Sequence, residues 1–199
     1  MNCKEPKVIS EIGCNHKGQM KIAGVDESGR GPIAGPVFAA AVVLDPTKDI
    51  PDLADSKKLT TNQIINLSKQ IKELSLSWSV RSSSVKEIEK LNILNASLLA
   101  MKRAVMSLDI KPSRLIIDGK FTFEMDIEMQ AIVKADTKYK EVMAASILAK
   151  HHRDNYMIKL DKKFPKYYFK NHKGYPTKQH LEAIELVGIC VHHRKTFKP

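Results

Sequence analysis

The chain has 199 residues, of which 43% are hydrophobic and 28% charged, values that are ordinary for a globular domain with one core. Its longest apolar run, residues 37–44, is far shorter than the roughly 20 residues that span a membrane, and its three cysteines fit neither a disulfide framework nor a zinc site. Thirty-three Lys and Arg residues against 22 Asp and Glu residues give a net charge of +11, which favours a polyanionic partner such as nucleic acid, although a charge that only maintains solubility would look the same.

Apolar residues recur with strand-like and helix-like spacing through most of the chain. Short runs of small or β-branched residues predict strands, and apolar residues three or four apart predict helices. Strands and helices that mix along the chain favour a layered α/β domain. In chain order the predicted elements are strands at 20–25 and 37–44, a helix at 62–74, a strand at 76–80, a helix at 93–108, strands at 114–119 and 131–133, and helices at 138–164 and 177–186.

Carboxylates follow three of the predicted strands. Asp26 and Glu27 end the first strand, Asp118 ends a later buried strand, and Asp136 follows the next one. Because α/β sheets place functional groups at the ends of their strands, four carboxylates could converge on one edge. Such a cluster repels itself, and divalent cations with oxygen ligands, magnesium or manganese, would compensate the repulsion. Two such ions can activate a water and stabilise the leaving oxygen of a phosphodiester.

Each of these acids also has a simpler interpretation. An Asp after a strand is often a turn former or a helix cap. Ligands from different strands have no fixed sequence interval, so spacing does not separate the two interpretations. The residues by themselves therefore support metal-dependent phosphoryl chemistry only as a hypothesis.

The segments around the acids carry a family signature. In order along residues 21–199 they resemble type 2 ribonuclease H, ribonuclease HII. The matching segments are 23–32 (AGVDESGRGP), 34–37 (AGPV), 55–59 (DSKKL), 92–94 (NIL), 117–119 (IDG), 134–136 (KAD), 144–147 (AASI) with Lys150, 153–154 (RD), 172–177 (HKGYPT) and 193–194 (HR).

This resemblance implies a ribonuclease H-like α/β fold: a mixed five-stranded sheet flanked by helices, with a small C-terminal helical part. It also implies two divalent ions, Mg²⁺ or Mn²⁺, held by four catalytic carboxylates. Carried over position by position, these are Asp26, Glu27, Asp118 and Asp136.

The resemblance further implies a substrate site beside the acids. Gly29, Arg30 and Gly31 match a glycine-arginine-glycine element whose backbone contacts the ribose 2′-hydroxyl, and glycines allow the close approach that this needs. The 2′-hydroxyl is the group that distinguishes RNA from DNA. Tyr175 matches a tyrosine that packs against the sugar at an RNA–DNA junction; the alternative is a core aromatic residue.

Three further matched residues have two open interpretations. Lys57 fits a phosphate contact, although a lysine before a helix is usually only solvated. Ser146 and Lys150, four residues apart, share one helix face near Asp136. They could contact the substrate, but packing of a helix on a sheet explains a small serine equally well.

The resemblance divides the chain into three parts. We expect residues 20–165 to form the catalytic domain and residues 166–199 to form a helical segment that contributes to substrate binding. Residues 1–19 read as a poorly ordered, non-catalytic extension. Part of it, residues 8–18, resembles the start of sialic acid synthases, but one strand and turn cannot form their barrel.

The predicted function is an endoribonuclease that hydrolyses the RNA strand of RNA–DNA hybrids and cuts on the 5′ side of ribonucleotides embedded in duplex DNA. We expect a cytoplasmic monomer with no membrane contact, since no signal sequence or apolar span is apparent. A non-catalytic duplex-binding module and a DNA recombinase or resolvase on the same fold are the alternatives. A binder has no need for gathered acids, and a recombinase would ignore the 2′-hydroxyl.

Overall fold

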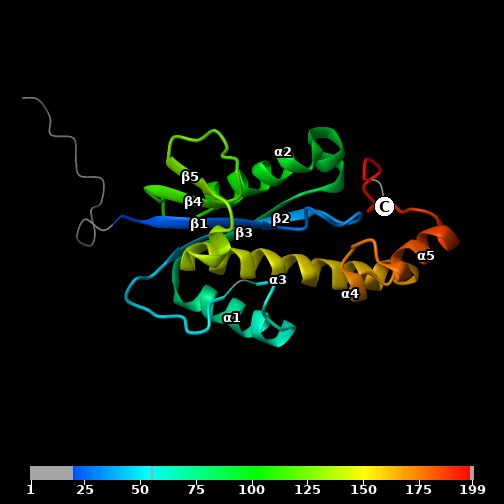
Figure 1. The fold of residues 1–199 in the computed structure, drawn as a ribbon, viewed down its shortest axis with the longest axis horizontal. Helices are drawn as coiled ribbons and strands as arrows, with labels where there is room; N and C mark the ends of the chain where they lie inside the picture. Colours follow the sequence, from blue (N-terminus) through cyan, green and yellow to red (C-terminus); the bar gives the residue numbers. More distant parts are fainter. Residues whose placement is uncertain (1–19, 55, 198–199) are drawn as a thin grey trace, which may run out of the picture.

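A five-stranded sheet with the order β3-β2-β1-β4-β5 forms the centre of the molecule (Figure 1). The computed structural model describes residues 20–54 and 56–197. Strands β1, β4 and β5 run parallel, and β2 is antiparallel to both of its neighbours. The elements are β1 (Ile22–Ser28), β2 (Val37–Leu44), α1 (Thr61–Leu74), β3 (Ser75–Ser83), α2 (Val85–Met106), β4 (Arg114–Asp118), β5 (Glu128–Ile132), η1 (Ala135–Thr137), α3 (Lys140–Lys163), η2 (Pro165–Tyr167), α4 (Phe169–His172) and α5 (Lys178–Val187). The predicted mixed sheet flanked by helices is confirmed.

Helices cover both faces of this sheet. Successive side chains of a strand point to opposite faces, so Ala23 and Val25 of β1 join the core under α2, whereas Ala40 and Val42 of β2 join the core under α1 and α3. Figure 1 shows α2 on one side of the sheet and α1 and α3 on the other. Two apolar layers therefore hold the sheet rigid, and its strand ends are fixed in space.

Helix α3 lies unusually close to strand β1. A Cβ atom built on Gly24 would stand 2.1 Å from the backbone carbon of Glu141, so only glycine fits there. The small, fully buried residues Ala144, Ala145 and Ala149 continue this contact along the helix. The close approach brings the face of α3 against the end of β1.

Two elements differ from the sequence-based predictions. The last strand spans 128–132 instead of 131–133, because it is an edge strand whose exposed polar residues hide the strand pattern. Helix α2 begins at Val85, eight positions before the predicted start. Asn92 interrupts it with φ of 66°, which splits the apolar pattern into two short pieces.

The C-terminal segment packs on the far end of α3 and on the loop after β1. Ala34 of that loop shares an apolar cluster with Met157 of α3, Phe169 of α4 and Ala183 of α5. Residues 1–19, predicted to be an extension, lie outside the described residues. Among the residues that are described, no helix is long and apolar enough to cross a membrane.

Candidate active site

The pairing of β1 with β4 places two of the predicted acids side by side. Val25 pairs with Ile117 in parallel register, so the next residues, Asp26 and Asp118, lie at the same level of neighbouring strands. Asp118 ends β4, whereas β1 continues to Ser28. Asp26 lies two positions after Gly24 and therefore on the face of the sheet that α3 covers. The register of two parallel strands thus brings together acids that are far apart in the sequence.

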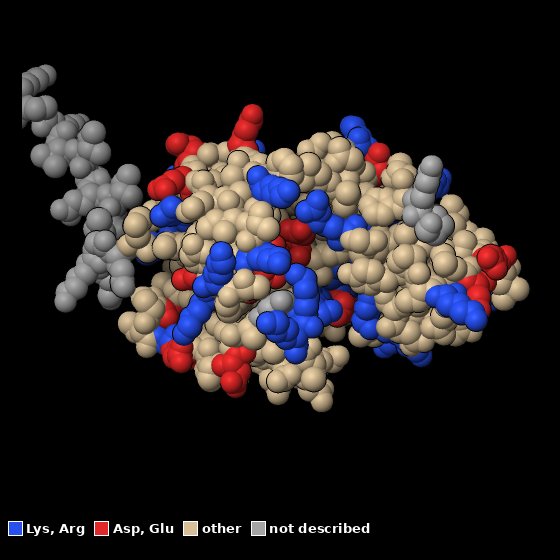
Figure 2. All heavy atoms as spheres, viewed as in Figure 1, with Lys and Arg blue, Asp and Glu red and all other residues tan. Residues whose placement is uncertain are grey.

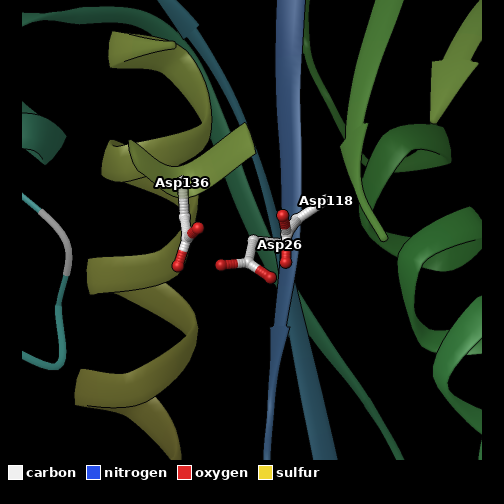
Figure 3. Close-up of side chains that lie close together, drawn as sticks. All are labelled: Asp26, Asp118 and Asp136. Atoms are coloured by element: carbon white, nitrogen blue, oxygen red, sulfur yellow. The ribbon is translucent and has the colours of Figure 1, made fainter. Parts of the chain in front are cut away.

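The short turn before α3 adds the third acid. Asp136 lies in η1 and is buried. The amide N–H of Ala135 donates a 2.7 Å hydrogen bond to Oδ1 of Asp118 and ties this turn to the end of β4. One carboxylate oxygen from each of Asp26, Asp118 and Asp136 lies within 4.8 Å of the other two, and Figure 3 shows the three side chains pointing toward one another.

This arrangement makes the carboxyl groups of Asp26 and Asp118 hard to ionise. Burial, and then the charges of Glu27 and Asp118, raise the pKa of Asp26 well above its ordinary value, while a hydrogen bond from Ser146 opposes the shift. Burial also raises the pKa of Asp118, with a further contribution from Asp136. Two acids that resist ionisation in the absence of a cation, with the carboxylate of Asp136 beside them, form a site that favours one.

Glu27 is placed differently from the three aspartates. It does not belong to their 4.8 Å cluster. Its Oε1 accepts a 3.4 Å bond from Arg30, and its Oε2 is buried with no hydrogen-bond partner among the described residues. Burial raises the pKa of Glu27, while Arg30 lowers it. The structure therefore brings together three of the four predicted ligands and leaves one buried oxygen of the fourth unsatisfied beside them.

Two of the three softer candidates, Lys57 and Ser146, contact the cluster, and Lys150 contacts Asp154 instead. The Nζ atom of Lys57 is 3.2 Å from Oδ2 of Asp136, and 76% of its side chain is exposed. Ser146 is buried, bonds to Asp26 and shares a 2.8 Å hydrogen bond with Ser56. Lys150 pairs with Asp154 at 2.9 Å. Ser146 thus holds a catalytic candidate in place, while Lys57 reaches the cluster from outside.

The predicted glycine-arginine-glycine element lies in the loop after β1, and its first residue, Gly29, is buried. Gly29 has φ of +103°, and a Cβ atom there would lie 2.1 Å from Nε of Arg153. Arg30 and Gly31 are exposed. Tyr175 is 48% exposed, and its ring lies beside Gly31, where a Cβ atom would stand 3.4 Å from Cε1. Tyr175 is therefore a surface aromatic residue next to the loop, not a core residue.

Sequence reasoning assigned no role to two buried arginines behind this loop. Arg153 and Arg194 are 1% and 2% exposed and donate to backbone carbonyl oxygens of residues 29–36. Arginine is rarely buried without an acidic partner, so composition and periodicity gave no signal for them.

Basic side chains gather on one face of the molecule. Figure 2 shows Lys and Arg side chains gathered around a small acidic spot at the centre of this face. An acidic centre with a basic rim suits a substrate with a phosphate backbone, since the rim attracts phosphates while the centre accepts cations.

Comparisons with known proteins agree with this arrangement. The sequence model of the family described as Ribonuclease HII matches residues 23–199. The chain is 52% identical over 179 residues to Ribonuclease HII from Nitrosomonas europaea, covering 89% of this chain and 82% of that protein. It is also 52% identical over 182 residues to Ribonuclease HII from Chromobacterium violaceum, covering 91% and 92% of the two chains.

Among solved structures, the ribonuclease H2 of Pyrococcus horikoshii superposes with a TM-score of 0.74 at 30% identity, over 90% of this chain and 94% of that one. The chain therefore belongs to the ribonuclease HII family, whose members are ribonuclease H-type endonucleases that act on RNA–DNA hybrids.

Proposed function

We propose that this protein hydrolyses the phosphodiester on the 5′ side of a ribonucleotide, both in RNA–DNA hybrids and at single ribonucleotides embedded in duplex DNA, and leaves 3′-hydroxyl and 5′-phosphate ends. The gathering of Asp26, Asp118 and Asp136 from three separate segments carries this proposal. Burial and neighbouring acids raise the pKa of Asp26 and of Asp118, and such groups destabilise a fold at neutral pH, so a compensating function is the simplest reason for them.

The donor set fits two divalent cations, Mg²⁺ or Mn²⁺. All three clustered ligand atoms are carboxylate oxygens, which these hard ions prefer. The buried, unsatisfied Oε2 of Glu27 adds a fourth acceptor at the edge of the cluster. Asp26 and Asp118 would hold the ions, with Glu27 and Asp136 completing their ligands. Two such ions, when bound, lower the pKa of a water and stabilise the leaving oxygen of the phosphodiester.

The neighbouring residues keep these carboxylates in fixed orientations. The hydrogen bond from Ser146 orients Asp26, and the amide of Ala135 orients Asp118. The exposed Lys57 provides a positive charge beside Asp136, where it can contact a substrate phosphate. Lys150 lies one turn beyond Ser146 on α3, and we assign it a weaker contact of the same kind.

Recognition of RNA belongs to the loop after β1 and to Tyr175. The amides of Arg30 and Gly31 can bond to a ribose 2′-hydroxyl, and the exposed ring of Tyr175 offers a flat apolar surface to the adjoining sugar. In this scheme residues 20–165 carry the catalytic site and residues 166–199 supply Tyr175. All of these residues come from one chain, so a monomer can carry out the reaction.

End-labelled duplexes test this function directly. One duplex is all DNA and a second carries one ribonucleotide, and both are incubated with and without Mn²⁺. We expect a single cut on the 5′ side of the ribonucleotide, only with the ion. A non-catalytic duplex binder would shift both duplexes and cut neither, and a resolvase would cut without regard to the ribonucleotide. Either result would overturn the proposal.

A further inference from the structure

The side chain of Arg194 comes from the C-terminal tail and inserts behind the loop that follows β1. Its Nη2 donates 2.6 Å to the carbonyl oxygen of Gly29, its Nη1 donates 3.0 Å to that of Arg30, and its Nε donates 2.9 Å to that of Gly35. The ring of Phe197 lies against the guanidinium, 4.9 Å away. One side chain therefore binds both ends of a loop some 160 residues earlier in the chain.

No carboxylate compensates the charge of this guanidinium. Among the described residues, neither Arg194 nor the neighbouring Arg153 forms an ion pair with an acid. Burial, and then the charge of Arg153, lower the pKa of Arg194 to about 9, so it stays protonated at neutral pH. A buried charge is costly unless it is well solvated, and here the loop carbonyls solvate it.

The direction of these carbonyls determines the direction of the loop amides. In a planar trans peptide the C=O of one residue and the N–H of the next point in opposite directions. When Arg194 draws the carbonyls of Gly29 and Arg30 inward, the amides of Arg30 and Gly31 must point outward. Both residues are exposed, and no described residue accepts a hydrogen bond from either amide.

The tail itself is anchored to the same loop. The amide of Arg194 donates 2.8 Å to the carbonyl of Ile33, and the amide of Gly35 donates 2.8 Å to that of His192. The position of the guanidinium is therefore fixed by backbone bonds independent of its own side chain. A side chain that only filled space would not need three donors aimed at three carbonyls.

We propose that Arg194 is a positioning residue for substrate recognition: it holds the peptides of Gly29–Gly31 with their N–H groups toward the substrate, ready for the ribose 2′-hydroxyl and the adjoining phosphate. This inference rests on the proposed function, because it assigns the loop amides to ribonucleotide recognition. Arg194 itself does not touch the substrate. Its removal affects the choice between a ribonucleotide and a deoxyribonucleotide more than it affects duplex binding in general.

The test compares Arg194→Lys and Arg194→Ala with Arg103→Ala as the matched control. Arg103 also donates to a carbonyl, that of Ser82, but lies on α2. Melting temperature, kcat and KM are measured on a duplex with one ribonucleotide, and affinities for this duplex and its all-DNA counterpart are measured in Ca²⁺. For both Arg194 variants we expect kcat/KM to fall about 100-fold, the usual effect of a small misplacement in a site. We also expect the ratio of the affinity for the ribonucleotide duplex to the affinity for the all-DNA duplex to approach one.

Chemical rescue separates positioning from folding. Methylguanidinium should restore much of kcat/KM to Arg194→Ala, methylammonium should not, and Arg103→Ala should respond to neither. Folded Arg194 variants with kcat/KM within threefold of the wild type, or with an unchanged affinity ratio, would overturn the inference.

If neither variant folds, hydrogen exchange of the wild-type amides tests the inference instead. The amides of Arg30 and Gly31 should exchange freely in the free protein and become protected only when the ribonucleotide duplex binds. Protection of these amides in the free protein would overturn the inference. A wild-type enzyme that does not distinguish the two duplexes would instead refute the proposed function.

Discussion

At the scale of single residues, the site combines charges that the fold alone would not favour. Asp26 is buried among other acids, and its pKa is raised. A carboxyl group whose pKa is raised on folding stabilises the folded state at low pH, and that contribution is lost as the pH rises through its folded pKa. At neutral pH the ionised cluster is therefore a destabilising feature that a bound cation would remove.

Asp26→Asn should abolish cleavage and stabilise the metal-free protein. The amide keeps the shape and the acceptor for Ser146 but removes the buried charge. In chelator at pH 7 we expect a higher melting temperature, by about 2–4 °C for each kcal/mol gained, and the difference should shrink toward pH 4. Mn²⁺ should raise the melting temperature of the wild type more than that of the variant. Retained turnover, or a lower melting temperature in chelator, would contradict the role of Asp26.

Gly29 is a second residue with a defined physical requirement. Gly29→Ala places a side chain at φ of +103° and pushes a Cβ atom to within 2.1 Å of Nε of Arg153, which is buried and held by carbonyl groups. Gly188→Ala is the matched control, since Gly188 also has positive φ, of +74°, but no atom within 4 Å of the added carbon.

Gly29→Ala should therefore cost about 2–4 kcal/mol in the free energy of unfolding, combining backbone strain with lost hydrogen bonds, against about 1 kcal/mol for the control. It should also reduce cleavage at a single ribonucleotide, while the control should not. Urea denaturation of both variants measures the difference. Equal losses would show that the contact with Arg153 is unimportant.

At the scale of elements, a chain of buried histidines supports the segment that carries Tyr175. Nδ1 of His180 donates 2.9 Å to the carbonyl of Tyr175, and Nδ1 of His193 accepts from the amide of Cys190. His193 must then carry its proton on Nε2 and donate it to Nε2 of His180, 3.1 Å away. His172 stacks on His180 with ring centroids 4.3 Å apart. All three rings are neutral in this arrangement.

Lowering the pH should reduce the stability of this segment. Burial lowers the pKa of His180 to about 4, and it lowers the pKa values of His172 and His193 as well. The unfolded chain takes up protons below about pH 6.5 that the folded chain cannot, so stability should fall between about pH 6.5 and 4, by about 3 kcal/mol for His180.

Melting temperatures from pH 7.5 to 4.5 measure this slope. His180→Gln should flatten it, whereas His151→Gln should change it less, because His151 is only half-buried and lies outside this histidine chain. A wild-type slope that His180→Gln leaves unchanged would contradict the neutral histidine chain.

The elements also show where sequence patterns stop being informative. The run at 37–44 predicts its strand with both bounds correct, because every position packs on a neighbour and the residues are uniformly apolar. The first half of α2 was missed because Asn92 in the left-handed region breaks the helical period, although Ser84 and Glu87 form a capping box at its start. Edge strand β5 was misplaced because half of it faces solvent.

Part of the candidate site was predictable because apolar runs mark the strands that carry its acids. Asp26 and Asp118 each follow an apolar run, so pattern alone places both close to the ends of strands, although β1 continues to Ser28. Glu27 is separate from the three aspartates because it follows Asp26 inside β1, where successive side chains point to opposite faces. The predicted strand stopped before Asp26, so this alternation was not applied to the pair. The role of Arg194 depends on bonds to residues 159 to 165 positions away, and such contacts exist only in the folded chain.

At the scale of the whole molecule, one rigid layer carries the acids while the C-terminal segment closes over the adjoining loop. The sheet fixes Asp26 and Asp118, α3 adds Ser146, and the tail adds Arg194 behind the loop. Elements from both ends of the described chain therefore meet at the loop after β1, and Figure 2 shows Lys and Arg side chains gathered on one face of the molecule.

The first 19 residues should not be needed for this assembly. Strand β1 begins at Ile22, and the resemblance to ribonuclease HII begins near the same point. A chain that begins at Met20 should keep full kcat and KM on a duplex with one ribonucleotide and should melt within about 1 °C of the full chain. A large loss of activity would show that the extension contributes to the site.

The central claim is that Asp26, Asp118 and Asp136 hold the cations that cut the phosphate backbone. Anomalous diffraction from crystals soaked in Mn²⁺ tests it most directly. We expect anomalous peaks between the three carboxylates, with oxygen ligands at roughly 2.0–2.3 Å, and no such peak in Asp26→Asn. Crystals in which the three side chains stand as described but bind no ion would contradict the account.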